Sequence, residues 1–403
     1  MTNTNGGKQA VILSGGGANG AYEVGVLKAL CSGLSPVTGG QPLAPDIFTG
    51  TSVGSYNAAF LVSQWETYGS SAIANLEQVW LDKLSNSPYK SSNGVFRFRA
   101  NPLDLINPLS FIPNPLQPFS QFANDSAFLA WQWLQRAVHL ATGQEAPLFQ
   151  RMTRLFDFSL FVSRQPLVQT LHETIRFADL RRAQKVLKIP VTNWGTGQVE
   201  IFGNSDMTEQ FGPLIISASS AIPGFFLPTE LGSQPCVDGA VLLNAPMKPA
   251  IDAEADILHV IYLDPVIRNI PFAGTSNTLD TLSRMQAVGL AKGFENDIAA
   301  AKRINQQLAS AKLTLEALDI LKQRASDTNL FAGIPLGEIE GYLRQSQEDY
   351  RQVTIHVYHP YDELGGGLEI LNFDRRRIQQ LIERGFDDAV DHQCDRSGCV
   401  LVP

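Results

Sequence analysis

Two glycine-rich turns in the first 54 residues constrain the fold of this chain more than any other feature. The first turn spans residues 14–20 with the sequence SGGGANG, and the second spans residues 50–54 with the sequence GTSVG. Each turn follows a short apolar run, at 9–13 and 46–49, and precedes a segment with apolar residues at helical spacing. We therefore expect two strand–turn–helix units, with each turn at the end of a strand.

The separation of the two turns predicts how they are arranged. It leaves room for one helix over 21–30, a loop that contains proline and glycine, and one strand, which together form a βαβ unit of about 30 residues. Strands joined in this way are parallel, with a right-handed crossover. Ligand sites of open α/β sheets lie at the carboxyl ends of the strands, so both turns should face one crevice. The expected fold class is α/β.

The residue types in the two turns indicate acyl transfer. The second turn has the Gly-x-Ser-x-Gly form of a nucleophile elbow, in which a serine, here Ser52, lies on a cramped strand-to-helix turn between glycines. The first turn offers consecutive backbone N–H groups at Gly15, Gly16 and Gly17, at a helix N-terminus that suits a developing negative charge. A nucleophile beside an anion-binding loop is the arrangement that acyl transfer needs.

Composition and charge limit the class of protein. The 403 residues allow one large α/β domain with additions, or two domains. The formal net charge of −8 argues against a nucleic-acid partner, since phosphate binding needs a clustered basic surface. The N-terminal residues lack the pattern of a signal peptide, and no uninterrupted apolar stretch reaches the roughly 18 residues of a membrane span. We expect a cytoplasmic protein, with peripheral membrane contact through apolar side chains as an alternative. The sequence does not indicate the oligomeric state.

Four cysteines are too few for a disulfide scaffold. Cys31 and Cys236 lie in apolar surroundings and are expected to be buried thiols. Cys394 and Cys399 are expected either to pair with each other or to lie in a flexible tail. We identify no histidine partner near these two cysteines, so the case for a metal site is weak, and we expect neither a metal ion nor a cofactor.

The segment 85–120 differs in character from the rest of the chain. It is rich in proline and apolar residues and carries few charges, which argues against a regular helix or a central strand. Loops of this length are usually functional or disordered. One interpretation is a segment that covers the core, and the other is a lid or a surface that docks on lipid. For the helix expected at 128–140, burial of Trp131 and Trp133 in the core is the simpler interpretation.

The rest of the chain alternates between strand-like and helical patterns, without an internal repeat. Strands are expected at 186–194, 199–202, 236–239, 257–263 and 353–358. Further helices are expected at 53–68, 167–182, 210–221, 278–324 and 375–390.

Asp238 is the expected base for the Ser52 hydroxyl. It lies in the stretch PCVDGA, at the end of an apolar segment and before a glycine that leaves room for another group. None of the six histidines lies in a recognisable motif, and each is more simply structural. A carboxylate with a reference pKa near 4 is a weak base for a hydroxyl. It therefore needs a site in which the oxyanion is stabilised as the proton moves.

Four blocks resemble the patatin-like phospholipase family, in the order that the family has them. The blocks are GGGxxG at 15–20, GTSVG at 50–54, ASSAIPGFF at 218–226 and DGA at 238–240. The resemblance implies a three-layer αβα sandwich with a mainly parallel sheet, and a calcium-independent hydrolase of lipid acyl esters. It implies no cofactor.

The resemblance also implies a division of the chain. It covers residues 8–264, the expected catalytic domain, which includes the proline-rich insert at about 85–120 and a helical insert at about 124–182. Residues 265–403 are expected to form a mainly helical extension with one returning strand, packed on the core.

Carried over by position, the resemblance implies roles for individual residues. Ser52 would be the nucleophile that forms an acyl-enzyme, Asp238 the general base, and the backbone N–H groups of residues 15–17 the oxyanion hole. The family usually has Arg or Lys at the position of Asn19, where it binds a headgroup or assists the oxyanion. The uncharged Asn19 predicts weaker headgroup electrostatics and a preference for neutral or single-chain esters.

Other functions share parts of these patterns. Residues 15–20 also satisfy the Gly-x-Gly-x-x-Gly pattern of a dinucleotide site, but the second strand does not end in the acidic residue that such a site needs. A Ser-His-Asp hydrolase with His356 or His392 needs more sheet before the elbow than 50 residues can hold. An acyltransferase on the same architecture, and a non-catalytic lipid-binding protein, remain as alternatives.

Overall fold

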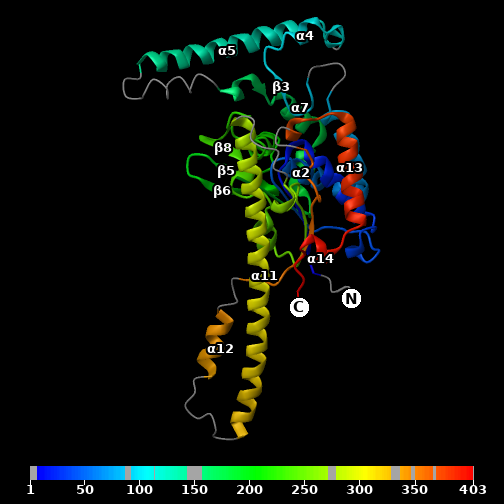
Figure 1. The fold of residues 1–403 in the computed structure, drawn as a ribbon, viewed down its shortest axis with the longest axis vertical. Coiled ribbons are helices and arrows are strands. Elements are labelled where there is room, and N and C mark those ends of the chain that lie inside the picture. Colours follow the sequence, from blue (N-terminus) through cyan, green and yellow to red (C-terminus); the bar gives the residue numbers. More distant parts are fainter. Residues whose placement is uncertain are drawn as a thin grey trace.

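The computed structural model describes residues 7–86, 92–112, 114–142, 157–270, 278–327, 336–345, 350–365 and 369–402. These residues form a central sheet of eight strands in the order β10–β9–β1–β2–β5–β8–β7, with β6 paired to β5 outside this order (Figure 1). The strands are β1 (Gln9–Leu13), β2 (Ile47–Gly50), β5 (Val186–Asn193), β6 (Gln198–Gly203), β7 (Thr229–Leu231), β8 (Gln234–Asp238), β9 (Ile257–Ile261) and β10 (Thr354–Tyr358).

The sheet is parallel at its centre and antiparallel at one end. β1 pairs in parallel with β2, where Leu13 faces Gly50, and with β9, where Leu13 faces Ile261. β10 and β5 extend this parallel part, whereas β6, β7 and β8 join antiparallel to their neighbours. The βαβ unit predicted from the two turns is therefore confirmed, and both turns leave the sheet at the same edge.

Apolar residues on both faces of β1 explain the layers. Val11 and Leu13 pack on one side against α1 (Ala21–Cys31), α2 (Val53–Tyr68) and α13 (Arg375–Val390). Ala10 and Ile12 pack on the other side, in a core that includes residues of α10 (Met247–Asp252) and α11 (Thr278–Asp327). A strand that is apolar on both faces is typical of a parallel sheet covered by helices. The predicted three-layer α/β sandwich is confirmed.

Most predicted helices are present, and some have different ends. The helices expected at 53–68 and 375–390 match α2 and α13, and the one expected at 167–182 is divided into α7 (Gln165–Thr174) and α8 (Phe177–Arg182). The other elements are α3 (Ala72–Val79), α4 (Leu103–Ile106), α5 (Gln117–Thr142), α9 (Phe211–Ser219), α12 (Leu336–Gln345), α14 (Cys394–Ser397) and the short strands β3 (Arg97–Phe98) and β4 (Val162–Ser163).

The proline-rich insert covers the core only at its start, where Phe96 is buried in the main core cluster; from α4 onward it projects away from the core. Figure 1 shows α4 and α5 projecting at one end of the molecule, and α11 projecting at the other. Trp131 is 58% exposed and Trp133 is 39% exposed, so their predicted burial is wrong. Exposed apolar side chains in the insert also include Leu103, Ile106, Ile112, Leu116 and Phe119. The pattern misled because α5 has no sheet beneath it. Within the described residues, no helix combines the length and apolar character needed to cross a bilayer.

Candidate active site

Ser52 lies at a strained turn between β2 and α2. Its φ is 55°, in the left-handed region that side chains rarely adopt. The flanking glycines are needed because a Cβ at Gly50 would overlap the Gly54 carbonyl, and a Cβ at Gly54 would lie 2.5 Å from the Leu13 carbonyl oxygen. The packing of the elbow against β1 thus explains the Gly-x-Ser-x-Gly pattern, and it presents the Ser52 side chain at the carboxyl edge of the sheet.

A serine from the third sequence block fixes the backbone of Ser52. The Ser52 N–H donates to the Ser219 hydroxyl oxygen at 3.1 Å, and the Ser219 hydroxyl donates to the Pro190 carbonyl at 2.8 Å. From the other side, the Ser55 hydroxyl donates to the Ser52 carbonyl at 2.5 Å. Sequence reasoning assigned Ser219 no role beyond its place in the block at 218–226, because its contact with Ser52 is made only in the folded chain.

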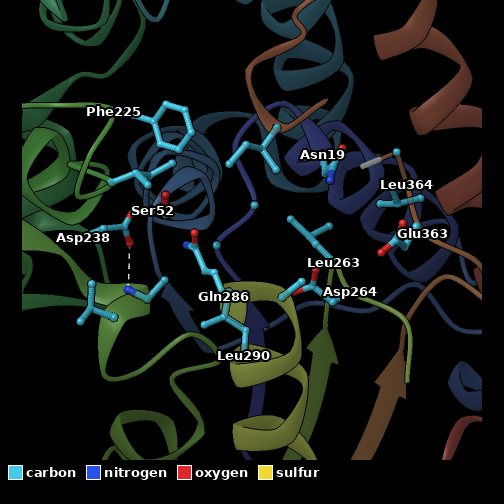
Figure 2. Close-up of a pocket in the computed structure, with 18 of the residues that line it drawn as sticks. Asn19, Ser52, Phe225, Asp238, Leu263, Asp264, Gln286, Leu290, Glu363 and Leu364 are labelled. Atoms are coloured by element: carbon cyan, nitrogen blue, oxygen red, sulfur yellow. Dashed lines mark hydrogen bonds between the residues drawn. The ribbon is translucent and has the colours of Figure 1, made fainter. Parts of the chain in front are cut away.

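Asp238 ends β8 and points one carboxylate oxygen at the same space as Ser52. Its N–H donates to the Ala221 carbonyl at 3.0 Å, and its Oδ1 accepts from the Ala240 N–H at 2.8 Å. Within the described residues, the buried Oδ2 has no hydrogen-bond partner. Figure 2 shows the Ser52 and Asp238 side chains next to each other. A buried acceptor without a donor is costly, so this oxygen is suited to receive a proton.

The surroundings of Asp238 make its carboxylate a stronger base. Burial raises the pKa of Asp238 to about 7, although the Ala240 N–H, the Ser52 hydroxyl and the Arg164 guanidinium each act to lower it. Arg164 donates to the Leu227 carbonyl at 2.8 Å and to the Thr229 hydroxyl at 2.7 Å. The sequence did not single out Arg164, which lies far from every glycine motif and approaches Asp238 only in the folded chain.

The glycine loop keeps two of its three N–H groups available. The Gly15 N–H donates to the Asn244 Oδ1 at 2.9 Å, so it is already engaged. Among the described residues, no acceptor is found for the N–H groups of Gly16 and Gly17. A Cβ at Gly16 would lie 2.6 Å from the Leu263 Cδ1, and Gly17 has a φ of 57°. Gly17 must be glycine, because a Cβ there would also overlap the Ile370 carbonyl oxygen, whereas a Cβ at Gly16 would require the Leu263 side chain to move.

The predicted residues line one cleft. Gly15, Gly16, Asn19, Ser52 and Asp238 all border a cavity of about 880 Å³, a volume that includes its open mouth. The C-terminal third completes it with Gln286 and Leu290 of α11 and with Glu363, Leu364 and Ile370 (Figure 2). Asp264 also lines it, with a pKa that burial raises to about 7. None of the described lining residues is a histidine, which gives no support to a Ser-His-Asp site.

A second, apolar pocket adjoins Ser52. It has a volume of about 490 Å³ and borders Gly17 and Ser52. Its other walls come from α2, the stretch between α3 and β3, α7, the block at 218–226 and the C-terminal segment: Val53, Tyr56, Trp80, Leu84, Val95, Leu167, Ser220, Ile222, Phe226, Ile370, Leu371 and Phe373. The chemistry of these walls suits a hydrocarbon chain.

Asn19 has a cationic partner that the sequence did not predict. The Arg377 guanidinium, on α13, donates to the Asn19 Oδ1 at 2.8 Å. Arg377 also forms an ion pair with Glu369 at 3.0 Å, which balances its charge. The folded chain therefore holds Arg377 next to a loop that carries no arginine of its own. Glu369 balances most of the positive charge of Arg377, so little of it is available to a substrate.

A family model and several solved structures match this chain. A family model described as patatin-like phospholipase matches residues 11–251, a range that contains both glycine turns, Ser219 and Asp238. Twelve chains of solved structures match. One is the crystal structure of VipD from Legionella pneumophila, at 14% identity and a TM-score of 0.32, covering 94% of this chain and 67% of that chain. A search of curated proteins finds no match.

Proposed function

The chain belongs to the patatin-like phospholipase family, and on this premise we propose that it is a serine hydrolase that cleaves fatty acyl esters of lipids through an acyl-Ser52 intermediate. The observation that carries the proposal is the meeting of Ser52, on its strained turn, with the unpartnered Oδ2 of Asp238 in one cleft. The pairing supports ester cleavage, and the family adds the lipid substrate, so the reaction we propose is that of a phospholipase A or lysophospholipase.

Each step of the reaction has a group to perform it. Asp238 takes the proton of the Ser52 hydroxyl as the oxygen attacks the ester carbonyl carbon, and the N–H groups of Gly16 and Gly17 stabilise the oxyanion. The tetrahedral intermediate collapses, the alcohol leaves with the proton from Asp238, and the acyl group stays on Ser52. Asp238 then activates a water that hydrolyses the acyl-enzyme and releases the fatty acid. No step uses a metal ion, so we expect activity without calcium.

The apolar pocket beside Ser52 supports a long-chain substrate. An acyl chain that enters it would place its ester carbonyl between Ser52 and Gly17, both of which border the pocket. The headgroup would then lie in the wider cleft near Asn19 and Asp264. Because acidic side chains and a neutralised arginine surround that space, a neutral or single-chain ester fits it better than an anionic headgroup.

We also propose that residues 8–264 form the catalytic domain and that residues 265–403 form an extension of it. The family match ends at residue 251, and the later residues add β10 to the same sheet. Residues of α11, together with Glu363, Leu364, Gly365 and Ile370, border the cleft. The extension therefore contributes to the substrate site as well as to the core.

The insert supports contact with a lipid surface. Two aromatic contacts join the cleft to the exposed Phe98 of the insert: Phe225 with Phe158 at 6.4 Å, and Phe158 with Phe98 at 6.3 Å between ring centroids. Exposed apolar side chains with few charged residues nearby partition into the interfacial region of a bilayer. We propose that α4 and α5 dock on a zwitterionic lipid surface and bring the cleft close to it.

The test is covalent labelling followed by product analysis. A fluorophosphonate should label the wild-type chain and should not label Ser52→Ala, and released fatty acid should disappear in the same variant. Labelling that persists in Ser52→Ala would contradict the assignment of the nucleophile. Transfer of the acyl group to an added alcohol or thiol, in preference to water, would favour the acyltransferase alternative. A chain that binds lipid but neither reacts with the probe nor releases acid would be a lipid-binding protein.

A further inference from the structure

Two histidines and two cysteines meet at the edge of the sheet, away from the cleft. His356 lies on β10, His392 follows α13, and Cys394 and Cys399 lie in the C-terminal tail. One ligand atom from each of the four residues lies within 4.8 Å of every other. The sequence-based statement that these cysteines have no histidine partner is therefore wrong. His392, two residues before Cys394, was the signal that could have found it.

Three of the six distances between ligand atoms of the cluster equal those of a tetrahedral metal site, and the others stay within 4.8 Å. His356 Nδ1 lies 3.5 Å from Cys394 Sγ, and His392 Nε2 lies 3.5 Å from both Cys394 Sγ and Cys399 Sγ. A tetrahedral zinc ion with its usual bonds to sulfur and nitrogen separates these two ligand atoms by about 3.5 Å. Thiol groups form only weak hydrogen bonds, so hydrogen bonding alone is a poor reason to gather these four groups around one point.

Neighbouring groups hold two of the four side chains, Cys399 and His392, in this arrangement. The Val357 N–H donates to Cys399 Sγ at 3.3 Å, and the Ser397 hydroxyl lies 3.4 Å from His392 Nδ1, the ring nitrogen that faces away from the cysteines. Such partners orient the ligands of known metal sites. Gly398, with a φ of 76°, reverses the chain after α14 and returns Cys399 toward Cys394.

The backbone of the tail is held in the same place. Val400 and Ile355 exchange two backbone hydrogen bonds of 2.7 and 2.8 Å. They form an isolated antiparallel bridge beside β10. The cluster therefore joins three parts of the chain: the edge strand, the end of α13 and the tail.

We propose that His356, His392, Cys394 and Cys399 bind one Zn²⁺ ion in a closed structural site. Four protein ligands leave no position open for water or substrate, which is the pattern of structural rather than catalytic zinc. Binding releases one proton from each thiol, so two thiolates balance the charge of the ion. None of the four residues lines the described cleft. The ion would fasten the tail and the end of α13 to β10 without taking part in ester cleavage.

The test is the zinc content of the full-length protein, purified without chelator and measured by mass spectrometry of the metal. We expect one zinc per chain, and after exchange with Co²⁺ the visible absorption of tetrahedral cobalt with a sulfur-to-metal band. Cys394→Ser, Cys399→Ser and His356→Asn should each lose zinc. Outer partners contribute about 10–100-fold to metal affinity, so Ser397→Ala should lose affinity within that range and the direct ligands should lose more.

Matched controls separate the site from general effects. Cys31→Ala and His359→Asn change the same residue types outside the cluster and should keep one zinc per chain. Ser52→Ala should also keep it, so that failure of the zinc site and failure of the proposed hydrolase are distinguishable. If the ligand variants do not fold, the cobalt spectrum of the wild type and a lower thermal midpoint after chelation supply the evidence.

Three results would overturn the proposal. They are a wild-type chain that stays metal-free when supplied with Zn²⁺, ligand variants that retain zinc as the controls do, and a mass two hydrogens lower, with Cys394 and Cys399 joined in a disulfide. All four cysteines are free thiols in the structure, which favours the metal over the disulfide.

Discussion

Asp238 is the residue whose ionisation we expect to set the pH dependence of ester cleavage. Burial raises its pKa to about 7, and only the ionised form accepts the proton of Ser52. Below that pH, kcat/KM should fall about tenfold for each pH unit, and above it the value should level off. The measurement is a pH–rate profile on a soluble ester. An inflection near pH 4, the ordinary range of a carboxyl group, would contradict the role of burial.

The control for this profile is Asp238→Asn, which keeps the shape of the side chain. Loss of a general base lowers the rate by about 10²–10⁴-fold. Because the folded pKa of Asp238 is raised, its stabilising contribution is present below the unfolded pKa near 4 and is lost as the pH rises through 7. Relative to the wild type, the Asn variant should therefore be more stable at pH 8 than at pH 5. The opposite order would show that the carboxylate is better solvated than its burial indicates.

Asn19 tests the electrostatics of the headgroup region. Its side chain accepts from Arg377, whose charge Glu369 balances, so the cleft offers little net positive charge there. Asn19→Arg adds a cation, and we expect the ratio of anionic phospholipid cleavage to neutral ester cleavage to rise. The ratio is the useful quantity because a general effect on catalysis cancels in it. An unchanged ratio would show that this position does not contact the headgroup.

At the scale of elements, the exposed face of the insert is the feature to test. Phe119→Ser combined with Trp131→Ser should lower turnover of phosphatidylcholine vesicles by tenfold or more, since each side chain is expected to gain about 1.5–3 kcal/mol from burial in lipid. Turnover of a soluble ester should not change, because neither residue lines the cleft. Vesicle sedimentation measures binding separately from catalysis.

Matched surface changes make this result specific. Leu313→Ser on α11 and Tyr342→Ser on α12 remove apolar side chains that are at least as exposed, at a site remote from the insert. They should leave vesicle turnover unchanged. Equal losses on vesicles and on the soluble ester in the insert variant would instead indicate damage to the fold.

The elements also show which parts of the fold are predictable from sequence. The turns at 14–20 and 50–54 were predictable because their glycines are required by contacts with residues close in sequence or on the adjacent strand, as at Gly50 and Gly54. The exposure of Trp131 was not predictable, because an apolar pattern identifies the apolar face of a helix and does not say what covers that face. Whether protein, lipid or water covers that face depends on where the helix projects.

At the scale of the whole molecule, the candidate site combines predictable and unpredictable residues. Ser52 and Asp238 lie in short motifs, and the βαβ connection alone placed Ser52 beside the glycine loop. Arg164, between β4 and α7, and Arg377, on α13, reach the site from far along the chain, and no local pattern marks them. The metal cluster needs a strand and a tail separated by α13. Within the cluster only His392, Cys394 and Cys399 share a local spacing; His356, Arg164 and Arg377 join their groups through tertiary packing, which no local spacing encodes.

The crossing of α1 and α13 joins the two ends of the chain and carries our last prediction. A Cβ at Gly385 would overlap the Tyr22 carbonyl, and a Cβ at Gly25 would overlap the Ile382 carbonyl, so the two backbones touch through a pair of glycines. Gly385→Ala must push the helices apart, and we expect it to lower the free energy of unfolding by about 1–3 kcal/mol or more. Gly341→Ala on α12, where a Cβ meets nothing within 4 Å, should raise it by up to about 1 kcal/mol.

Denaturant unfolding of both variants measures the difference in the free energy of unfolding. Activity of the cleft is an independent second measurement. Because α13 carries Arg377, displacing it should loosen the loop that holds Asn19 and lower activity below the temperature at which the chain unfolds. Gly341→Ala should leave activity unchanged. If Gly385→Ala unfolded and reacted like the wild type, the C-terminal helix would be a loose addition, and the cleft would have to be complete without it.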